Sequence, residues 1–322
     1  MNAPPAGLTL DPNSDTGVAG DDRTKMAVVK INGTVLESNG QIGLYDAGNL
    51  IAVSDVGSMA GGKFSLDTVN GLSAGKHTLT AVWTDTAKTV SIASSELVVT
   101  IDNQAASASI TEASIIRQGH SSTINLAGSA SDDFGGSVSV DVYRDGQKIG
   151  AATTSSGAWS FEDVKASASI HGYTIGSTDA AGNSAMMDQT VRVGTSGFDT
   201  LHGTAGSDLI VGGAGADILS GDGGNDTFIW SAGDAPFVMI KNKLAQPERI
   251  TDFSAGDKLD LTGLGHLDFS GQTQTTSADH VNWYFSGGDT FVVADVNGDG
   301  RPDFIVELIG QHTLSANDFL LV

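Results

Sequence analysis

A nine-residue pattern that repeats four times without interruption constrains this chain more than any other feature. The copies read GTSGFDTLH, GTAGSDLIV, GGAGADILS and GDGGNDTFI, and together they span residues 194–229 of 322. Positions one and four are always glycine, position six is always aspartate and position eight is always apolar. A flexible glycine-rich linker has no reason to keep a fixed apolar position. The period therefore predicts a repetitive folded structure.

Each copy is expected to form a turn followed by a short strand. In the turn, the glycines are expected to adopt positive φ and to direct carbonyl oxygens inward. In the strand, the apolar residue faces a narrow core. If two copies make one coil, copies one and three stack on one side and copies two and four on the other. Asp199 then pairs with Asp217, and Asp208 pairs with Asp226.

Paired carboxylates and converging carbonyls are the ligand set of calcium, a hard cation that takes several oxygen ligands. Composition favours a cation as the partner, because the net charge is −22 and residues 194–322 carry 18 acidic but only 5 basic side chains. The candidate calcium ligands in the repeats are Gly194, Ser196, Asp199, Gly203, Ala205, Asp208, Gly212, Ala214, Gly215, Asp217, Gly221, Gly223 and Asp226.

The same composition excludes other classes of partner and site. So acidic a chain is repelled by nucleic acid and by anionic membrane surfaces, and no apolar run approaches the ~20 residues that span a bilayer. The absence of cysteine excludes disulfides, thiolate metal sites and cysteine nucleophiles. The opening MNAPPAGLTLDPNSDTG lacks the organisation of a secretory signal peptide. Taken alone, that favours the cytosol, and the alternative is an export route that reads another signal.

Two segments before the nonapeptides repeat one another. Gly33 recurs as Gly128 and Phe64 recurs as Trp159, each 95 residues later. Short alternating stretches separated by turn signals predict β-sandwiches. The expected fold is all-β, with a β-sandwich and its acidic N-terminal linker in residues 1–102, a second β-sandwich in 103–193, a short parallel β-roll in 194–230 and a β-rich C-terminal domain in 231–322. Both sandwiches are expected to be Ig-like by a resemblance given below.

Local patterns add three expectations. Alternation in HTLTAVWTD places Leu79, Ala81 and Trp83 on one face of a strand. The pair Asp145-Gly146 predicts a hairpin turn. The segment Phe237 to Glu248 is the best candidate for a helix in the chain.

The nonapeptides resemble those of the RTX (repeats-in-toxin) family of Gram-negative exoproteins. The sequences that follow them, RITDFSAGDKLDLTGL, TFVVADVNGDGRPDFIVELIG and the closing DFLLV, resemble the C-terminal domain shared by serralysin-type proteases and other type I secretion substrates. The resemblance implies that Asp252, Asp257 and Asp260 contribute to calcium binding at the end of the roll. It also implies the type I secretion machinery as a partner, with an uncleaved signal at residues 318–322. DFLLV is also good sequence for a last strand, but the nonapeptides upstream favour the signal.

The stretch DVNGDGRPD leaves two interpretations open. Asp295, Asn297 and Asp299 match the first half of a calcium loop, and Asp303 is the only late acidic candidate inside it, because Glu307 lies one position too far for an EF-hand. The Asn-Gly and Asp-Gly pairs could equally supply the turns of a hairpin.

The stretches LDPNSDTGVAGDD and TDAAGN resemble bacterial Ig-like repeats of giant surface adhesins, in which acidic linker residues often bind calcium. By this resemblance Asp11, Asp15, Asp21 and Asp102 are candidate ligands. Solvated turn aspartates are the alternative.

The sequence contains no catalytic motif of the HExxH, GxSxG or P-loop type, and no enzymatic activity is expected. His77 and His171 recur at equivalent positions of the two sandwiches, which favours a structural role. Two function classes remain. The first is the C-terminal part of a secreted RTX adhesin that folds on calcium and attaches to a surface or glycan, at the cell surface of a Gram-negative bacterium or in a biofilm. The second is the non-catalytic accessory and secretion region of an extracellular hydrolase.

Overall fold

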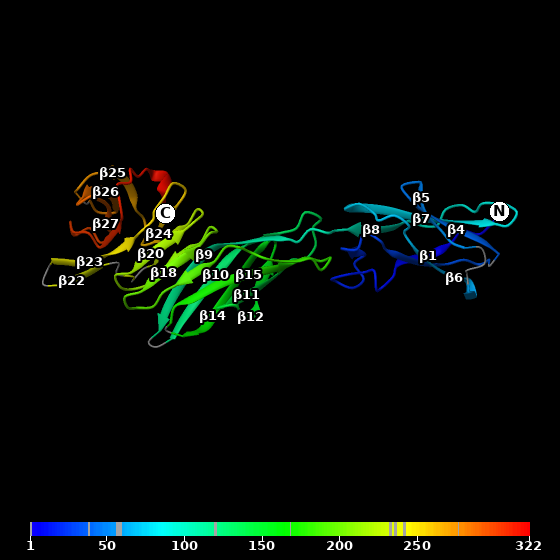
Figure 1. The fold of residues 1–322 in the computed structure, drawn as a ribbon, viewed down its shortest axis with the longest axis horizontal. Helices are drawn as coiled ribbons and strands as arrows, with labels where there is room; N and C mark the ends of the chain where they lie inside the picture. The colour runs from blue at the N-terminus through cyan, green and yellow to red at the C-terminus, as the bar shows by residue number, and fades with distance from the viewer. Residues whose placement is uncertain are drawn as a thin grey trace. The chain divides into compact units, whose positions relative to one another are not determined.

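The computed structural model describes residues 2–37, 39–55, 60–118, 121–167, 169–231, 234, 237–240, 243–275 and 277–322. These residues form β-strands and two single-turn 3₁₀ helices, η1 (Ala60–Gly62) and η2 (Ala316–Asp318), so the predicted all-β class is confirmed (Figure 1). No helix in this part of the chain is long and apolar enough to cross a membrane. The chain divides into two compact units, one with residues 1–107, 131–139 and 177–185, the other with 108–130, 140–176 and 186–322.

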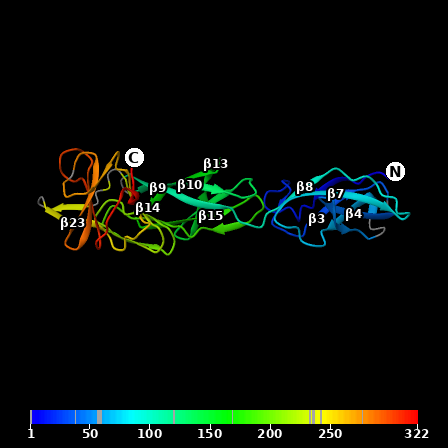
Figure 2. The same ribbon diagram turned by 90° about the horizontal axis from the view of Figure 1, so that it is seen from above.

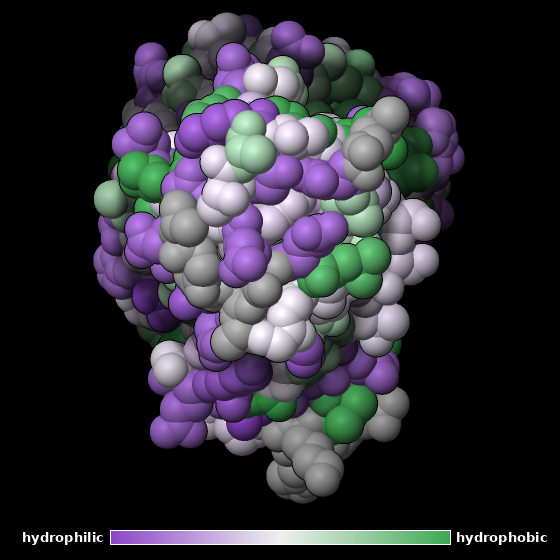
Figure 3. Space-filling view, turned by 90° about the vertical axis from the view of Figure 1, so that its right-hand side faces the viewer, coloured by the Kyte–Doolittle hydropathy of each residue, from purple (hydrophilic) through white to green (hydrophobic). Residues whose placement is uncertain are grey.

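The first unit contains a sandwich of two sheets. Leu79, Ala81 and Trp83 line its core and are fully buried, as their alternation predicted. On the side of the molecule shown in Figure 3, hydrophilic residues are interspersed with hydrophobic ones. One sheet has the order β1 (Ala6–Leu10), β3 (Lys30–Thr34), β6 (Lys63–Asp67), and the other has the order β2 (Arg23–Thr24), β8 (Leu97–Ile101), β7 (Gly75–Asp85), β4 (Gly40–Asp46), β5 (Asn49–Val53).

The second sandwich also consists of two sheets, whose strands are the green ones in Figure 2. Its predicted hairpin is confirmed, because Asp145 and Gly146 have φ values of 51° and 79° and join two antiparallel strands. One sheet has the order β13 (Thr153–Ser155), β14 (Ala158–Ser167), β10 (Ser121–Ser131), β9 (Ser107–Gln118). The other begins with β12 (Gln147–Ala151), β11 (Ser139–Arg144), β15 (His171–Thr178), β17 (Val191–Val193), with β16 (Ser184–Met186) paired to β15.

The structure explains why glycine and an aromatic residue recur together. Gly33 pairs with Phe64 across two strands, and Gly128 pairs with Trp159 in the same way. A Cβ atom on Gly33 would lie 2.4 Å from the Phe64 ring, and one on Gly128 would lie 2.9 Å from the Trp159 ring. Each ring therefore covers its partner strand only because that strand has no side chain there.

The two recurrent histidines hold hairpin turns. Nδ1 of His77 lies 2.7 Å from Oδ2 of Asp46, and Nδ1 of His171 lies 2.8 Å from Oδ2 of Asp145. Both rings are buried. The repeated contact supports the structural role that the sequence favours.

A buried polar network also stabilises the second sandwich. Asp163 accepts hydrogen bonds at Oδ2 from Arg144 Nη1 at 2.6 Å and from the Tyr173 hydroxyl at 2.9 Å. Burial raises the pKa of Tyr173 well above its usual value, and the hydrogen bond to Asp163 raises it further. The phenol therefore stays a donor throughout the physiological range.

The sheet that contains β17 continues through the nonapeptides into the C-terminal region (Figure 1). Beyond β17 it adds β19 (Leu209–Val211), β21 (Thr227–Ser231), β24 (Lys258–Gly263) and β29 (Phe319–Leu320), all in parallel. A second sheet has the order β18 (Thr200–Thr204), β20 (Ile218–Asp222), β23 (Lys243–Ile250), β28 (Phe304–Leu308), β27 (Asp289–Asp295), β26 (His280–Ser286), β25 (Asp268–Gln272).

The two sheets enclose one core. Its members include the apolar residues at position eight of the nonapeptides, which are Leu201, Ile210, Leu219 and Phe228. The last strand belongs to it as well, since Phe319 is buried with its ring centroid 5.2 Å from that of Phe269. The sheet passes without a break through the position that the sequence suggests as a domain boundary, and that division stays a prediction.

The expected helix at residues 237–248 is wrong. The segment forms β22 (Phe237–Ile240) and most of β23, which pair antiparallel; residues 241 and 242 lie outside the described part. A short isolated helix is marginal without tertiary support, and Pro247 would interrupt it. As a strand, β23 joins both β20 and β28 in parallel, so tertiary pairing decides the outcome.

Candidate calcium centre

Nonapeptide aspartates stack in two buried columns. Thr200 pairs with Ile218 and Leu209 pairs with Thr227, so strands 18 residues apart lie side by side and two copies make one coil, as predicted. The backbone N–H of Asp199 donates to Oδ1 of Asp217 at 2.8 Å. The backbone N–H of Asp208 donates to Oδ1 of Asp226, also at 2.8 Å. The structure therefore brings together the two pairs that the spacing predicted.

A third coil extends both columns beyond the nonapeptides. Ile218 pairs with Arg249, which places Glu248 beside Asp217. On the other side, the backbone N–H of Asp226 donates to Oδ1 of Asp257 at 2.9 Å. The columns are therefore Asp199–Asp217–Glu248 and Asp208–Asp226–Asp257.

Sequence reasoning found Asp257 but missed Glu248. The β22–β23 hairpin interrupts the nine-residue spacing, so Glu248 does not fall on the period. The usable signal was the triplet Glu248-Arg249-Ile250, which repeats the acidic, variable, apolar order of positions six to eight.

Glu248 is the most unusual acid of the described chain. Its side chain is 0 % exposed, and the Trp230 indole N–H donates to Oε2 at 2.9 Å. Oε1 has no hydrogen-bond partner among the described residues. Burial raises the pKa of Glu248 well above its usual value, the Trp230 hydrogen bond opposes this rise, and the nearby Asp217 charge adds to it. Such an oxygen is costly to bury unless a proton or a cation satisfies it.

Asp226 shows the same effect in the other column. Burial raises its pKa to about 6, the backbone N–H of Asp208 opposes the rise, and the charge of Asp257 is the first of several that add to it. Carboxylates stacked out of water repel one another. A divalent cation between them would remove the repulsion.

The glycines make room for carbonyl oxygens, and only some of them need positive φ. At position one, a Cβ on Gly194 would lie 2.2 Å from the Gly212 carbonyl oxygen, and one on Gly203 would lie 2.4 Å from that of Gly221. None of the position-one glycines has positive φ, so the expectation of left-handed turns is wrong there. Positive φ occurs in the second coil, at Gly213, Gly215, Asp222 and Gly224.

The donor set of the roll fits calcium. Its oxygens are carboxylates and main-chain carbonyls, with no nitrogen or sulfur ligand among the candidate positions. Calcium prefers such hard oxygen ligands and tolerates irregular geometry. The orphaned Oε1 of Glu248 and the glycine-lined approach of carbonyls are the two features that a bound ion would explain.

Two further candidates lie outside the columns. Oδ1 of Asp252 accepts from Gly221 N at 3.0 Å, and its Oδ2 accepts from Asp222 N at 2.8 Å. Oδ1 of Asp260 accepts from the amide and hydroxyl of Thr262. Both carboxylates therefore bind hydrogen-bond donors of nearby turns, and their contribution to calcium stays a prediction.

The loop between β27 and β28 is a closely hydrogen-bonded turn. Asp295 accepts from Gly298 N at 2.7 Å and from Gly300 N at 2.9 Å. Asp303 accepts from the backbone of Asn297 at 2.9 Å. Oδ1 of Asp299 accepts from the backbone N–H of Arg301. These contacts suit the turn interpretation, and calcium binding by this loop stays a prediction.

A second acidic cluster lies in the first unit. One carboxylate oxygen from each of Asp102, Asp132 and Asp133 lies within 4.8 Å of the others. Asp102 is 1 % exposed, and its Oδ2 and both oxygens of Asp132 have no hydrogen-bond partner in the described part. Burial raises the pKa of Asp102, and the charges of Asp179 and Asp133 add to the rise. Sequence reasoning named Asp102 but missed its neighbours, because they approach it only in the folded chain.

The other N-terminal candidates do not join this cluster. Asp11 accepts from Asn13 N at 2.9 Å and from the Asn32 side chain at 2.9 Å. Oδ2 of Asp15 accepts from a backbone amide five residues later. Asp21 accepts from the backbone two residues later. The contacts of Asp11 and Asp21 match the turn alternative, whereas Oδ1 of Asp15 is buried without a hydrogen-bond partner in the described part. Calcium binding by all three residues stays a prediction.

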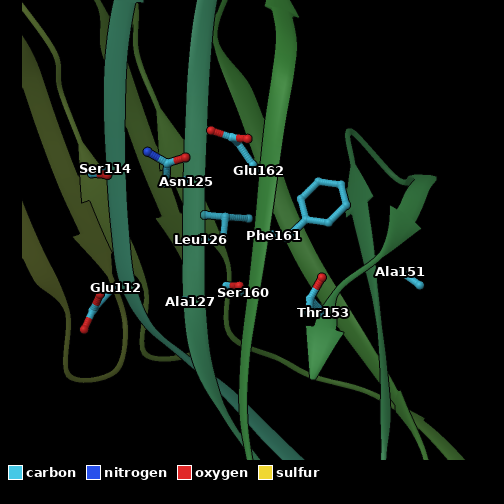
Figure 4. Close-up of a pocket in the computed structure, with 10 residues that line it drawn as sticks. All are labelled: Glu112, Ser114, Asn125, Leu126, Ala127, Ala151, Thr153, Ser160, Phe161 and Glu162. Atoms are coloured by element: carbon cyan, nitrogen blue, oxygen red, sulfur yellow. The ribbon is translucent and has the colours of Figure 1, made fainter. Parts of the chain in front are cut away.

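Each sandwich also carries a shallow hollow on equivalent strands. In the second sandwich it measures about 640 Å³ and lies over β9, β10 and β14, with Glu112, Asn125, Phe161 and Glu162 among its lining residues (Figure 4). In the first sandwich a hollow of about 570 Å³ lies over β1, β3 and β6. A surface or glycan ligand for either stays a prediction.

Comparison with known families identifies the class of the roll. Residues 193–228 match the RTX calcium-binding nonapeptide repeat in four copies. RTX nonapeptide repeats bind calcium, so the predicted cofactor is confirmed. Residues 2–103 match a bacterial Ig-like domain and residues 98–175 a bacterial Ig domain. These domain types are typically non-catalytic and fit an extracellular or surface protein of adhesin-like organisation.

Solved structures resemble parts of the chain. The AlgE6R3 subunit of the Azotobacter vinelandii mannuronan C5-epimerase is 28% identical, with 40% of this chain and 80% of that chain covered and a TM-score of 0.30. A structure from a 1.5-MDa bacterial ice-binding adhesin is 15% identical, with 58% and 62% covered and a TM-score of 0.30. The human OSCAR ligand-binding domain is 12% identical, with 58% and 100% covered and a TM-score of 0.30. No curated protein matches the chain.

Proposed function

We propose that this chain is the C-terminal part of a secreted, calcium-dependent RTX adhesin that attaches a Gram-negative cell to a surface or to a biofilm. In this proposal residues 1–102 and 103–193 are spacer domains, 194–230 is the calcium-binding roll and 231–322 is a serralysin-like domain for export. The observation that carries the proposal is the pair of buried carboxylate columns directly after two Ig-like sandwiches. Such columns make folding depend on a cation that is scarce inside cells and abundant outside.

The mechanism is linkage between calcium binding and folding. Without calcium, the stacked carboxylates repel and the unfolded roll stays competent for export. Outside the cell, sites with Kd of about 10⁻⁴–10⁻³ M fill. At a tenfold excess of calcium each site adds about 1.4 kcal/mol to the free energy of unfolding. Two or more such sites can decide whether a domain of marginal stability folds.

Circular dichroism of the full chain during calcium titration tests this proposal. Chelation should remove β-signal in a reversible step that corresponds to residues 194–322, and calcium should restore it. Magnesium at the same concentration is the control, because it demands a stricter geometry and gives up its water reluctantly. An unchanged spectrum in chelator would overturn the proposal.

Export by the type I machinery is tested separately. The signal is proposed to lie in residues 318–322, whose strand β29 packs Phe319 into the core once the domain folds. A cell with a type I exporter should release the full chain but retain a chain that ends at residue 317. Equal release of both chains would exclude a signal in these five residues.

The cluster of Asp102, Asp132 and Asp133 is proposed as a second calcium site. The unsatisfied oxygens of Asp102 and Asp132 support it. The proposal predicts that calcium raises the unfolding temperature of the first unit, and that Asp132→Asn together with Asp133→Asn abolishes the rise. A rise that persists in the double variant would exclude this site. Asp11, Asp15 and Asp21 are proposed to contribute less, since each already accepts backbone hydrogen bonds.

A further inference from the structure

The two coils of the roll differ at position two of the nonapeptide. Copies one and two have Thr195 and Thr204 there, whereas copies three and four have Gly213 and Asp222. Gly213 and Asp222 have φ values of 90° and 63°, a region that threonine avoids. The difference therefore changes both the backbone of the turn and the donors that it offers.

In the first coil, threonine satisfies the aspartate of its own copy. Oδ2 of Asp199 accepts from Thr195 N at 2.6 Å and from its hydroxyl at 2.8 Å. Oδ2 of Asp208 accepts from Thr204 N and from its hydroxyl. The backbone N–H and the hydroxyl of Thr190 both donate to Oδ1 of Asp208. A carboxylate that accepts several such hydrogen bonds is stabilised as an anion without a cation.

In the second coil, position two offers no hydroxyl. Gly213 has no side chain, and the carboxylate of Asp222 accepts from Ser220 Oγ at 2.8 Å. A Cβ on Gly212 would lie 2.6 Å from Oε1 of Glu248 and 2.9 Å from Oδ2 of Asp217. Two carboxylate oxygens therefore flank one glycine, and the Glu248 oxygen is fully buried without a hydrogen-bond partner in the described part.

We propose that the roll holds a calcium ion between the second and third coils, in the column of Asp217 and Glu248, and that the first coil needs no ion of its own. The other column offers no such oxygen among its described residues, because Oδ2 of Asp257 already accepts from the amide and the hydroxyl of Ser254. The first coil is then a base, closed by threonine, on which the calcium-binding layer is stacked. This inference rests on the proposed calcium dependence of the roll and names the layer that carries it.

Calcium stoichiometry of the full chain tests the layer. Isothermal titration with calcium chloride should show one ion fewer for Glu248→Gln than for the parent chain. The matched variant Asp199→Asn lies in the same column but one coil before Asp217, and it should keep the parent stoichiometry. Loss of an ion in Asp199→Asn, or its retention in Glu248→Gln, would overturn the proposal.

Terbium luminescence provides a readout for variants that lose stability. Terbium occupies calcium sites and is sensitised by a nearby indole, and the Trp230 indole binds Glu248 directly. Luminescence excited through tryptophan should fall several-fold in Trp230→Phe and in Glu248→Gln, and should stay unchanged in Asp199→Asn. Equal luminescence in parent and Glu248→Gln would mean that Glu248 and Asp217 share a proton instead of an ion, which refutes the proposal.

The two hypotheses fail in different ways. If the parent chain takes up no calcium at all, the proposed function itself is refuted. If the parent takes up calcium but an ion is lost with Asp199→Asn and kept with Glu248→Gln, only the layer assignment is refuted.

Discussion

Replacing glycine by alanine at two positions of the same nonapeptide tests whether close approach of the neighbouring coil is what requires glycine. In Gly194→Ala, the new methyl group would lie 2.2 Å from the Gly212 carbonyl oxygen and 3.0 Å from Oδ2 of Asp199. The coils must move apart, and overpacking of this kind costs about 1–3 kcal/mol. In Gly197→Ala the nearest atom is the Thr195 hydroxyl, at 3.8 Å, which is ordinary contact.

Neither glycine has positive φ, so alanine is compatible with both backbones. Thermal unfolding in saturating calcium should therefore show a Tm lowered for Gly194→Ala by roughly 2–4 °C per kcal/mol. Gly197→Ala should be neutral or stabilising by about 0.4–1 kcal/mol, because alanine reduces the entropy of the unfolded chain. Equal loss in both variants would refute the steric explanation of the glycine at position one.

In calcium-free buffer, Asp102→Asn should raise the Tm of the first unit, because it removes one of several repelling buried charges. In saturating calcium the same substitution removes a ligand and should lower the Tm. Calorimetry in both buffers measures whether the change in Tm reverses sign. In the second sandwich, Asp163→Asn should lower the free energy of unfolding by about 2 kcal/mol and Tyr173→Phe by about 1 kcal/mol, measured in urea. Burial tends to raise the pKa of Asp145, but a backbone amide and His171 lower it overall. Its contribution is therefore present above the unfolded-state pKa of about 4 and is lost as the pH falls through the lower folded value. The urea midpoint should fall in that acidic window, and Asp145→Asn should remove this part of the fall.

The columns of the roll could be predicted because the period fixes them. Once two copies make a coil, strand pairing 18 residues apart follows, and Asp199 must lie beside Asp217. The core could be predicted for the same reason, since position eight always faces inward. Where spacing alone determines the contact, the sequence is sufficient.

The contacts that the sequence did not reveal depend on tertiary pairing. Glu248 reaches its column only because the β22–β23 hairpin returns the chain to β20. Asp132 and Asp133 meet Asp102 across about thirty residues of intervening chain. The helix expected near Phe237 fails in the same way, because local propensity is weaker than the pairing of β23 with two neighbours.

Four nonapeptides form only two coils, and this explains why the roll is continuous with its neighbours. A short stack of repeats exposes its end layers and needs caps. At one end β17 extends the sheet, and Thr190 takes the place of an aspartate one coil before Asp208. At the other end, Glu248 and Asp257 form the last layer of the columns. The strands that follow them, β23 and β24, pack into the same core as Trp230. The N-terminal cap belongs to a sandwich with its own core, whereas the C-terminal cap closes over the acidic layer itself. Loss of calcium should therefore destabilise residues 249–322 before it affects residues 108–176, and hydrogen exchange in chelator should show protection lost in that order.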